Sequence, residues 1–428
     1  MNNRVVVTGL GVCAPNGVGL TNFYNALYNG NSGIRFQQEL ADLDFGCQIA
    51  GKPSVSTALM ENYFTPLQLK GLNSSGIVYG VLAGTDAWMD AGLQKADRLE
   101  PSWDSGIVFG TGLLGVDKLK EAIQLIDNHN CRRLGSNSVM QTMASGISAY
   151  LAGILGCGNQ VTSNSSACAT GTEAVIMGME RIRCGKAYRM LVGSCNDSGP
   201  YIWGGFDAMR ILPSSYNDSP HMGSRPMSKN ASGFVPGSGA GALVLESLSS
   251  ALERGAYIYA EVLGGAVNSG GQRGSGSMTA PNREAVQRCI LDALFDAKIK
   301  KEEVDVINGH LTATSKDVEE IANWAETLDR YGKDFPLINS TKGITGHCLA
   351  ASGSIECVAS LLQFQQEVVF GNINCDPLHP EITKLCHPSR IPLKTIAYKP
   401  NVTAKASFGF GDVNACVIFK SYKKTDDG

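Results

Sequence analysis

Cys168 is the residue of this chain whose surroundings most suggest covalent chemistry. It stands among small residues in SNSSACATGT, residues 163–172, where a strand-like run gives way to a helix-like run at residues 167–184. A helix N-terminus stabilises anions through its free N–H groups, so we expect a depressed pKa and a nucleophilic thiolate at this position. On its own, a cysteine in such a run is more often a buried packing residue.

Two histidines follow short predicted strands. His310 comes just after an apolar run in VINGHLTAT, residues 306–314, and Lys342 and His347 lie in STKGITGH, shortly before a helix predicted to begin near residue 349. Ligands and catalytic groups gather outside the carboxyl ends of strands in α/β sheets, which makes these side chains candidates for a site. The structural alternatives are a loop histidine bonded to a carbonyl, a helix-capping histidine and a solvated lysine.

A glycine-rich loop lies close to the C-terminal end of the sequence. ASFGFGDVN, residues 406–414, sets two phenylalanines among glycines before a final strand. Glycine permits positive φ and a close approach of the backbone, so N–H groups of this loop could hold an oxyanion. Each of these segments is a weak signal when taken alone.

Alternating strand-like and helix-like runs must position these residues, and they predict an α/β fold. Apolar runs at residues 106–110 and 190–193 predict buried strands, and residues 138–155 predict one buried or interface helix. The second part of the chain repeats the style of the first, with a break near residue 255. We therefore expect two halves, 1–255 with Cys168 and 256–428 with the other candidate residues.

Composition narrows the class of protein. The chain has 428 residues, 43% of them hydrophobic and 18% charged, which is typical of an ordered globular protein. A net charge of −3 gives no global basic field for nucleic acid, and no apolar run is long enough to predict a membrane span. The first residues lack a signal-peptide pattern, so we expect a cytoplasmic protein. Thirteen scattered cysteines without a CxxC pair predict no metal site.

In this order, the segments resemble the signature of β-ketoacyl synthases I and II. The match consists of ACATG with Cys168, GHLTAT with His310, STKGITGH with His347, and SFGFG, with lesser support from RVVVTGLGV at the start and GFVPGSGAG at residues 233–241. The resemblance extends over essentially the whole chain. It implies the thiolase fold, a five-layer αβαβα unit built from two related halves, usually forming a homodimer.

The resemblance also implies a reaction. Cys168 would take an acyl group from an acyl carrier protein, and malonyl carrier protein would lose carbon dioxide to give an enolate that attacks the acyl-cysteine. Thioester exchange needs a soft nucleophile, and neutral imidazoles of His310 and His347 can donate hydrogen bonds to the enolate oxygen. Backbone N–H groups of Cys168 and Phe410 would hold the acyl oxyanion, and Phe410 would act as a gate. No bound cofactor is implied, because 4'-phosphopantetheine on the carrier protein holds the substrates.

Further residues take supporting roles by the same resemblance. Lys342 with Glu356 resembles the pair that orients the surroundings of the second histidine. The remaining matches are an acidic pair, two threonines at the phosphopantetheine arm, a side chain that limits the acyl pocket near the dimer interface, and an aromatic residue of that pocket: Asp317 and Glu320, Thr312 and Thr314, Leu113, and Phe206.

The chain departs from the family pattern at several positions. Leu311 replaces an expected glycine, and the stretch from His310 to Asp317 is one residue short. Asp412 replaces the glycine after the gate, where it could restrain the swing of the loop or contact a neighbouring cation. The helix that usually offers several basic residues to the carrier protein has only Lys70. These departures favour a specialised branch, such as a type II polyketide or polyene system, over housekeeping fatty acid synthesis.

Other functions remain as alternatives. A non-catalytic chain-length factor, with which a synthase can form a heterodimer, shares the fold but usually lacks the cysteine. A degradative thiolase uses a second cysteine in a glycine-rich loop, which neither Cys386 nor Cys416 occupies. An initiating synthase carries asparagine where His347 stands. A dinucleotide-binding reading of TGLGVCAPNG fails because the GxGxxG spacing is absent.

Overall fold

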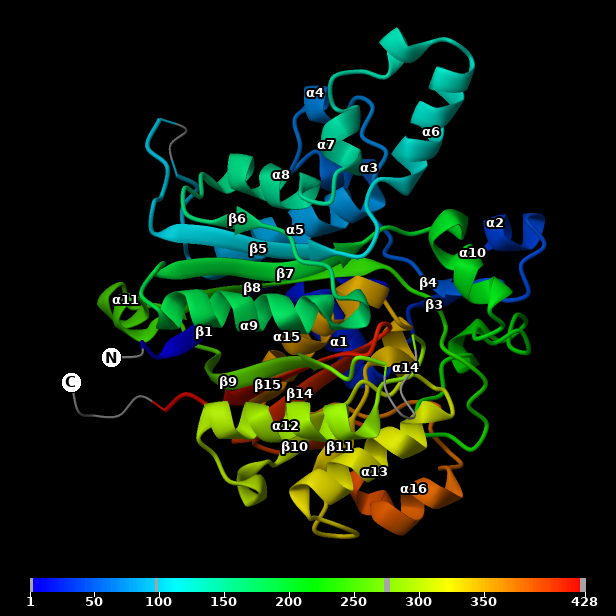
Figure 1. Ribbon diagram of the computed structural model, residues 1–428, viewed down its shortest axis with the longest axis vertical. Helices are drawn as coiled ribbons and strands as arrows, with labels where there is room; N and C mark the ends of the chain where they lie inside the picture. Colours follow the sequence, from blue (N-terminus) through cyan, green and yellow to red (C-terminus); the bar gives the residue numbers. More distant parts are fainter. Residues whose placement is uncertain (1–2, 97–98, 273–277, 424–428) are drawn as a thin grey trace.

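The protein is built in five layers of helices and strands. The computed structural model describes residues 3–96, 99–272 and 278–423. Figure 1 shows helices α5 and α8 above one group of strands, α9 and α15 in the middle, and α12 and α13 below a second group of strands. The bounds of these helices are α5 Ser75–Asp90, α8 Gly146–Leu155, α9 Thr170–Arg183, α12 Arg283–Ala297, α13 Lys316–Leu328 and α15 Ser352–Gln366.

The strands from the centre of the sheet to one of its edges come from the N-terminal part of the chain. They run in the order β1-β8-β7-β5-β6, with two antiparallel pairings followed by two parallel ones. Their bounds are β1 Val5–Ala14, β5 Ser105–Thr111, β6 Val161–Thr162, β7 Arg189–Asn196 and β8 Gly239–Ser247.

The C-terminal strands repeat this arrangement. They run β9-β15-β14-β10-β11, again with two antiparallel and then two parallel pairings. Their bounds are β9 Ala260–Ser269, β10 Val306–Asn308, β11 Leu337–Asn339, β14 Val402–Gly409 and β15 Val413–Lys420. A short antiparallel contact between β1 and β9 joins the two groups. The matching strand order, strand direction and layering confirm the thiolase fold of two related halves. The sequence similarity between the halves is too faint to demonstrate this relation.

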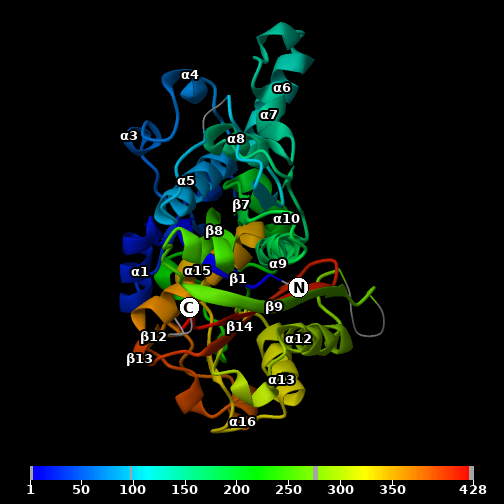
Figure 2. The ribbon, with the colours of Figure 1, turned by 90° about the vertical axis from the view of Figure 1, so that its left-hand side faces the viewer.

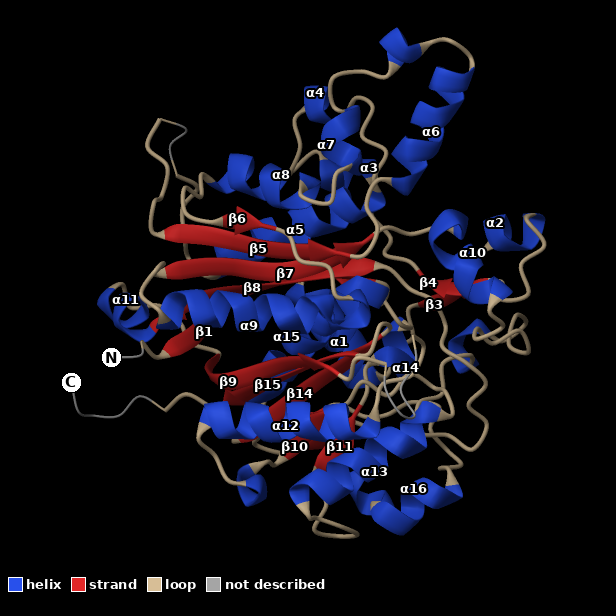
Figure 3. Cartoon of the chain, viewed as in Figure 1, coloured by secondary structure: helices blue, strands red, loops and turns tan. Residues whose placement is uncertain are grey.

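Shorter elements surround these layers, as Figure 2 shows from the side and Figure 3 by type of secondary structure. The helices are α1 Leu20–Asn29, α2 Gln38–Asp42, α3 Thr57–Met60, α4 Pro66–Leu69, α6 Val116–Asp127, α7 Ser138–Thr142, α10 Pro200–Ala208, α11 Leu248–Glu253, α14 Lys342–Thr345 and α16 Pro380–Leu385. The strands are β2 Gly17–Val18, β3 Ile34–Phe36, β4 Ile49–Gly51, β12 Val368–Val369 and β13 Ile396–Ala397. Among the described residues, no helix combines the length and apolarity needed to cross a bilayer.

The two central helices start in the same way and touch at glycines. Single turns of 3₁₀-helix, Ala167–Ala169 and Leu349–Ala351, lead into α9 and α15, and the first residue of each turn has positive φ, 47° at Ala167 and 52° at Leu349. A Cβ at Gly171 would lie 2.3 Å from the backbone nitrogen of Ser354. Only glycine allows this contact, which brings the N-terminus of α9, the helix that follows Cys168, against α15 of the other half.

The single helix predicted for residues 138–155 is wrong. The chain forms α7 and α8 with an extended Met143 between them, at φ −77° and ψ 140°. A Cβ at Gly146 would lie 2.1 Å from the carbonyl oxygen of Met140, so the chain folds back on itself too tightly for a continuous helix. The sequence of residues 138–155 is a run of mostly apolar and small residues, and it contains no residue pattern that predicts this break.

Candidate active site

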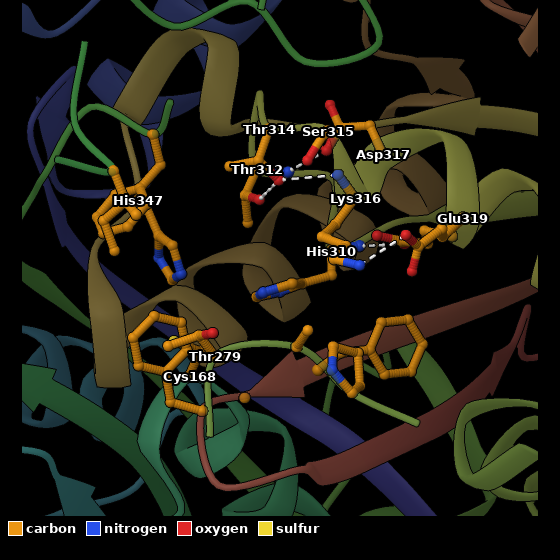
Figure 4. Close-up of a pocket in the computed structure, with 18 of the residues that line it drawn as sticks. Cys168, Thr279, His310, Thr312, Thr314, Ser315, Lys316, Asp317, Glu319 and His347 are labelled. Atoms are coloured by element: carbon orange, nitrogen blue, oxygen red, sulfur yellow. Dashed lines mark hydrogen bonds and ion pairs between the residues drawn. The ribbon is translucent and has the colours of Figure 1, made fainter. Parts of the chain in front are cut away.

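A cavity of about 270 Å³ opens where the two halves meet, and the candidate residues line it. Cys168 comes from the turn before α9, His310 from the end of β10 and His347 from the segment after α14. Figure 4 shows the two imidazoles directed toward each other with Cys168 beside them. The sulfur and one nitrogen of each ring all lie within 4.8 Å of one another. The structure therefore brings together three residues that are far apart in the sequence.

The environment of the Cys168 thiol differs from the expected one. Burial raises the pKa of this thiol to about 11, although the Lys342 ammonium and the backbone N–H groups of Phe410 and Cys168 itself act to lower it. The expectation of a depressed pKa is therefore wrong, because it considered the helix N-terminus without the loss of solvent. The same N–H groups converge beside the sulfur, where they could also hold a developing oxyanion.

The tautomer of His347 is fixed by its neighbours. The backbone N–H of Leu349 donates to Nδ1 at 3.1 Å, and the hydroxyl of Ser352 lies 2.9 Å from the same atom. Nδ1 is therefore the acceptor, so in the neutral ring the proton is on Nε2. Burial, followed by the positive charges of Lys342 and Lys405, holds the pKa of His347 well below its usual range.

His310 is neutral for similar reasons. Burial lowers its pKa most, followed by Lys342, His347 and Lys405. The two rings are perpendicular, with centroids 5.3 Å apart, and His310 also meets the edge of Phe408. Two neutral imidazoles thus face one cavity. His347 can donate a hydrogen bond there from Nε2, and His310 can donate a hydrogen bond or accept a proton.

The acidic pair holds the loop that carries His310. Glu320 accepts hydrogen bonds from the backbone N–H groups of His310 at 2.6 Å and Leu311 at 2.7 Å. Asp317 accepts from the backbone N–H groups of the next residues, 312 and 313, at 2.8 and 3.1 Å. Burial raises the pKa of Asp317 to about 6 and that of Glu320 to about 7.

The shortened loop after His310 has an unusual backbone. Leu311, at the position of the expected glycine, is fully buried with φ 24°, and Ala313 has φ 64°. Thr312 and Thr314 line the cavity, with their hydroxyl oxygens 3.1 Å apart. The shorter loop is therefore accommodated by left-handed backbone conformations, which the carboxylates of Asp317 and Glu320 support through hydrogen bonds. Both threonines still face the cavity.

Two lysines share one glutamate behind the histidines. Nζ of Lys342 pairs with Oε1 of Glu356, and Nζ of Lys405 lies 2.9 Å from Oε2. All three side chains are buried. Lys405 was missed at the sequence level, although a lone charged residue in the run VTAKASFG of a buried strand could have flagged it.

The cysteine and histidines cluster in space, although their spacing in the chain predicted no such cluster. Donor atoms of this kind at this separation could hold a metal ion. The positive charges of Lys342 and Lys405 close behind them disfavour a divalent cation at this position, because only one carboxylate compensates the two ammonium groups. The arrangement suits an anionic intermediate better.

Phe410 and its neighbours form the apolar wall of the cavity. The ring of Phe206 lies 6.0 Å from that of Phe410, centroid to centroid, and both line the cavity. Asp412 is fully buried, and its carboxylate accepts hydrogen bonds from the backbone N–H groups of Gln272 at 3.1 Å and Asn282 at 2.8 Å. Among the residues that the structure describes, Asp412 therefore meets backbone donors and forms no ion pair.

Leu113 does not line this cavity. Its side chain is 53% exposed in the single chain, next to α6 on the outside of the first half. Cys386 and Cys416, considered for a degradative thiolase, are fully buried and also absent from the cavity wall. The assignment of Leu113 to an acyl pocket therefore depends on a second subunit covering it.

Comparison with known proteins places this site in a class. The model of the beta-ketoacyl synthase N-terminal domain matches residues 2–251, and that of the C-terminal domain matches residues 259–376. The chain therefore belongs to the β-ketoacyl synthase family of condensing acyltransferases. It is 34% identical to the chloroplastic 3-oxoacyl-(acyl-carrier-protein) synthase I of Arabidopsis thaliana, with 98% of this chain and 87% of that one covered.

Two solved structures are similar along their whole length. One is AntDE:AntF, a type II polyketide synthase acyl-carrier protein in complex with its ketosynthase bound to the hexaketide, with a TM-score of 0.85 and 28% identity. The other is the ishigamide ketosynthase/chain length factor, with a TM-score of 0.86 and 26% identity. Each alignment covers 99% of this chain and 100% of the other.

Proposed function

We propose that the protein joins an acyl group held on Cys168 to a malonyl unit, as a β-ketoacyl-acyl-carrier-protein synthase. The observation that carries this proposal is the grouping of one thiol and two neutral imidazoles within 4.8 Å in a cavity between the halves. A condensing enzyme needs a nucleophile for thioester exchange and hydrogen-bond donors for an enolate, and this group supplies both.

In the first half-reaction, the sulfur of Cys168 attacks the thioester carbonyl and the carrier thiol leaves. With a thiol pKa of about 11, little thiolate exists at neutral pH, so the proton must pass to a neighbouring base as the sulfur attacks. The neutral imidazole of His310 can accept it and return it to the carrier sulfur as that sulfur leaves, whereas the cavity-facing Nε2 of His347 already carries a proton. The carbonyl oxygen becomes an oxyanion, which the N–H groups of Cys168 and Phe410 would bind.

In the second half-reaction, the malonyl carbon–carbon bond breaks, carbon dioxide leaves, and the electron pair moves into an enolate. The Nε2–H of His347 can donate a hydrogen bond to the enolate oxygen, and an N–H of His310 can donate a second one. The enolate carbon then attacks the acyl-cysteine carbonyl, and the bond from carbon to Cys168 sulfur breaks. Lys342 and Glu356 act behind the histidines and touch no reacting atom.

Substrates would reach the cavity on the 4'-phosphopantetheine arm of an acyl carrier protein. Thr312 and Thr314 stand at the cavity wall, where their hydroxyls can bind the amides of such an arm. The solved complex of a ketosynthase with its carrier protein supports this partner. The similarity to both plastid synthase I and type II polyketide ketosynthases supports fatty acid or polyketide synthesis, and the changed residues around the gate favour the polyketide or polyene branch.

A second synthase subunit would cover the edge of the first half. Strand β6 ends the sheet path, and the same half of the chain carries exposed apolar side chains on and around α6 and α7, at Leu113, Leu119, Ile123 and Val139. We propose a homodimer through this edge, with a chain-length-factor homologue as the alternative partner, as in the ishigamide assembly. Molecular mass in solution, measured with and without such a homologue, decides between them.

Covalent trapping tests the central assignment. The protein is incubated with an acyl carrier thioester or an epoxide inhibitor, and the adduct is located by mass spectrometry after proteolysis. Cys131 and Cys184 are exposed and serve as internal references for non-specific modification. We expect Cys168 alone to carry the acyl group, with no adduct in the Cys168→Ala protein. An adduct on another cysteine, with Cys168 unmodified, would refute the proposal.

A further inference from the structure

Lys405 takes no part in the two proposed half-reactions, yet it is among the most buried charged residues near the site. Its side chain has no exposed surface, and it comes from β14, three residues before Phe408, the first residue of the FGF segment that forms the cavity wall. Burial of an ammonium group is costly unless it is paired. The residue that pairs with it is Glu356, which also pairs with Lys342.

Hydrogen bonds connect Lys405 to the helix of the nucleophile. Its Nζ donates to the carbonyl oxygen of Ala406 and to the hydroxyl oxygen of Ser407, the latter at 2.9 Å. Since that hydroxyl accepts from Lys405, its own proton is free to bond to the Thr172 hydroxyl, 2.8 Å away on α9. One ammonium group thus joins Glu356, the strand of the gate and the helix that follows Cys168.

Lys405 leaves an excess of positive charge around the histidines. Lys342 and Lys405 act electrostatically on both rings, His347 also acts on His310, and Glu356 is the carboxylate that the lysines share. One glutamate against two lysines leaves a net positive charge behind the imidazoles. Asp317 and Glu320 lie on the other side of the His310 loop, where their oxygens are occupied by backbone N–H groups.

We propose that Lys405 is a positioning residue for the decarboxylation step: it shares Glu356 with Lys342 and places a second positive charge behind both histidines. This charge opposes protonation of the two rings, so they remain neutral hydrogen-bond donors to the enolate oxygen. The inference rests on the proposed function, because it gives the histidines their donor role. Lys405 touches no substrate and acts only through the histidines and Glu356.

The test uses malonyl decarboxylation in the Cys168→Gln background, which removes the condensation step from the readout. We compare the pH profile of this activity with Lys405 intact and in Lys405→Met. A unit charge acting over about 6–10 Å at an effective dielectric constant of about 20 changes a pKa by about one to two units. Without Lys405 the histidine pKa rises, so the acid side of the profile should move to higher pH by about one to two units.

Two controls separate charge from structure. Ser407→Ala removes the hydrogen-bond acceptor but keeps the Lys405 charge, so its acid limb should stay in place. With Cys168 present, the pH profile of thiol alkylation should be nearly unchanged by Lys405→Met, because Lys342 is the lysine that lowers the pKa of this thiol. A merely structural defect would disturb both profiles.

The outcomes are distinct. If Lys405→Met does not fold, Lys405→Gln removes the charge while keeping a hydrogen-bond donor, and the same shift is expected. Glu356→Gln, which leaves the two lysines uncompensated, should move the acid limb in the opposite direction. The inference is overturned if the acid limb moves by less than about a tenth of a pH unit in each soluble variant. Such a movement is far below the expected change. Absence of decarboxylation in the protein with Lys405 intact would instead refute the proposed function itself.

Discussion

Asp412 is the most informative single residue to change, because its carboxylate ties the gate to a segment far away in the sequence. It accepts hydrogen bonds from the backbone N–H groups of Gln272 and Asn282, and a Cβ at Gly270 would lie 2.0 Å from its Oδ2. The perturbation is Asp412→Gly, which restores the residue usual in the family. The backbone bond from Gly270 N–H to the carbonyl oxygen of residue 412 is available in the variant as well.

The magnitude follows from two opposing effects. Each hydrogen bond to a buried carboxylate contributes about 1.5–3 kcal/mol, so the loss of two costs about 3–6 kcal/mol. Glycine relieves the left-handed backbone of Asp412, at φ 62°, by about 1 kcal/mol. We therefore expect the free energy of unfolding to fall by about 2–5 kcal/mol. Asp412→Asn keeps one acceptor oxygen and should lose less.

Stability and both half-reactions are measured on the same preparations. Urea unfolding followed by tryptophan fluorescence gives the free energy, and acylation of Cys168 and malonyl decarboxylation give the kinetics. Residues 279–281 line the cavity beside Asn282, so loosening this segment should slow both half-reactions. An Asp412→Gly protein with unaltered unfolding midpoint and unaltered half-reactions would show that the carboxylate restrains neither the segment nor the gate.

Two further predictions concern the site itself. Cys168→Gln should abolish condensation and retain malonyl decarboxylation, whereas His310→Ala or His347→Ala should lower decarboxylation by ~10²–10³, the usual effect of removing one such donor; full decarboxylation in both histidine variants would contradict their role. If a second subunit covers Leu113 and makes it the end of an acyl pocket, Leu113→Ala should favour longer acyl chains by about one to two orders of magnitude in acylation rate, since each buried methylene contributes about 0.8 kcal/mol. Rates measured on a ladder of chain lengths test this, and a uniform loss at every length would make Leu113 structural.

The fold and the three central residues could be predicted because each lies in a short segment whose residue types are unusual together. Cys168 and His310 each lie between a strand and a helix, and His347 lies between α14 and the 3₁₀ turn before α15; such positions are local features of a sequence. The layered fold followed from the resemblance, and its detailed symmetry became visible only in the matching strand orders.

What could not be predicted depends on contacts between distant segments. The pKa of the Cys168 thiol is set by burial, which a helix N-terminus in a sequence does not reveal. The partners of Asp412 are 130 and 140 residues away along the chain. Lys405 lies in an otherwise apolar strand, and nothing local indicates that a glutamate from α15 meets it.

The matched starts of α9 and α15 carry a consequence for how this molecule arose. ACATGT at residues 167–172 and LAASGS at residues 349–354 occupy equivalent places in the two halves, each with a positive φ at its first residue and a glycine at its fifth. The counterpart of Cys168 is thus Ala350. Such correspondence indicates duplication of an ancestral unit. In the proposed reaction one copy supplies the thiol and the other supplies both imidazoles, so divergence between the copies would have made one asymmetric centre out of a symmetric scaffold.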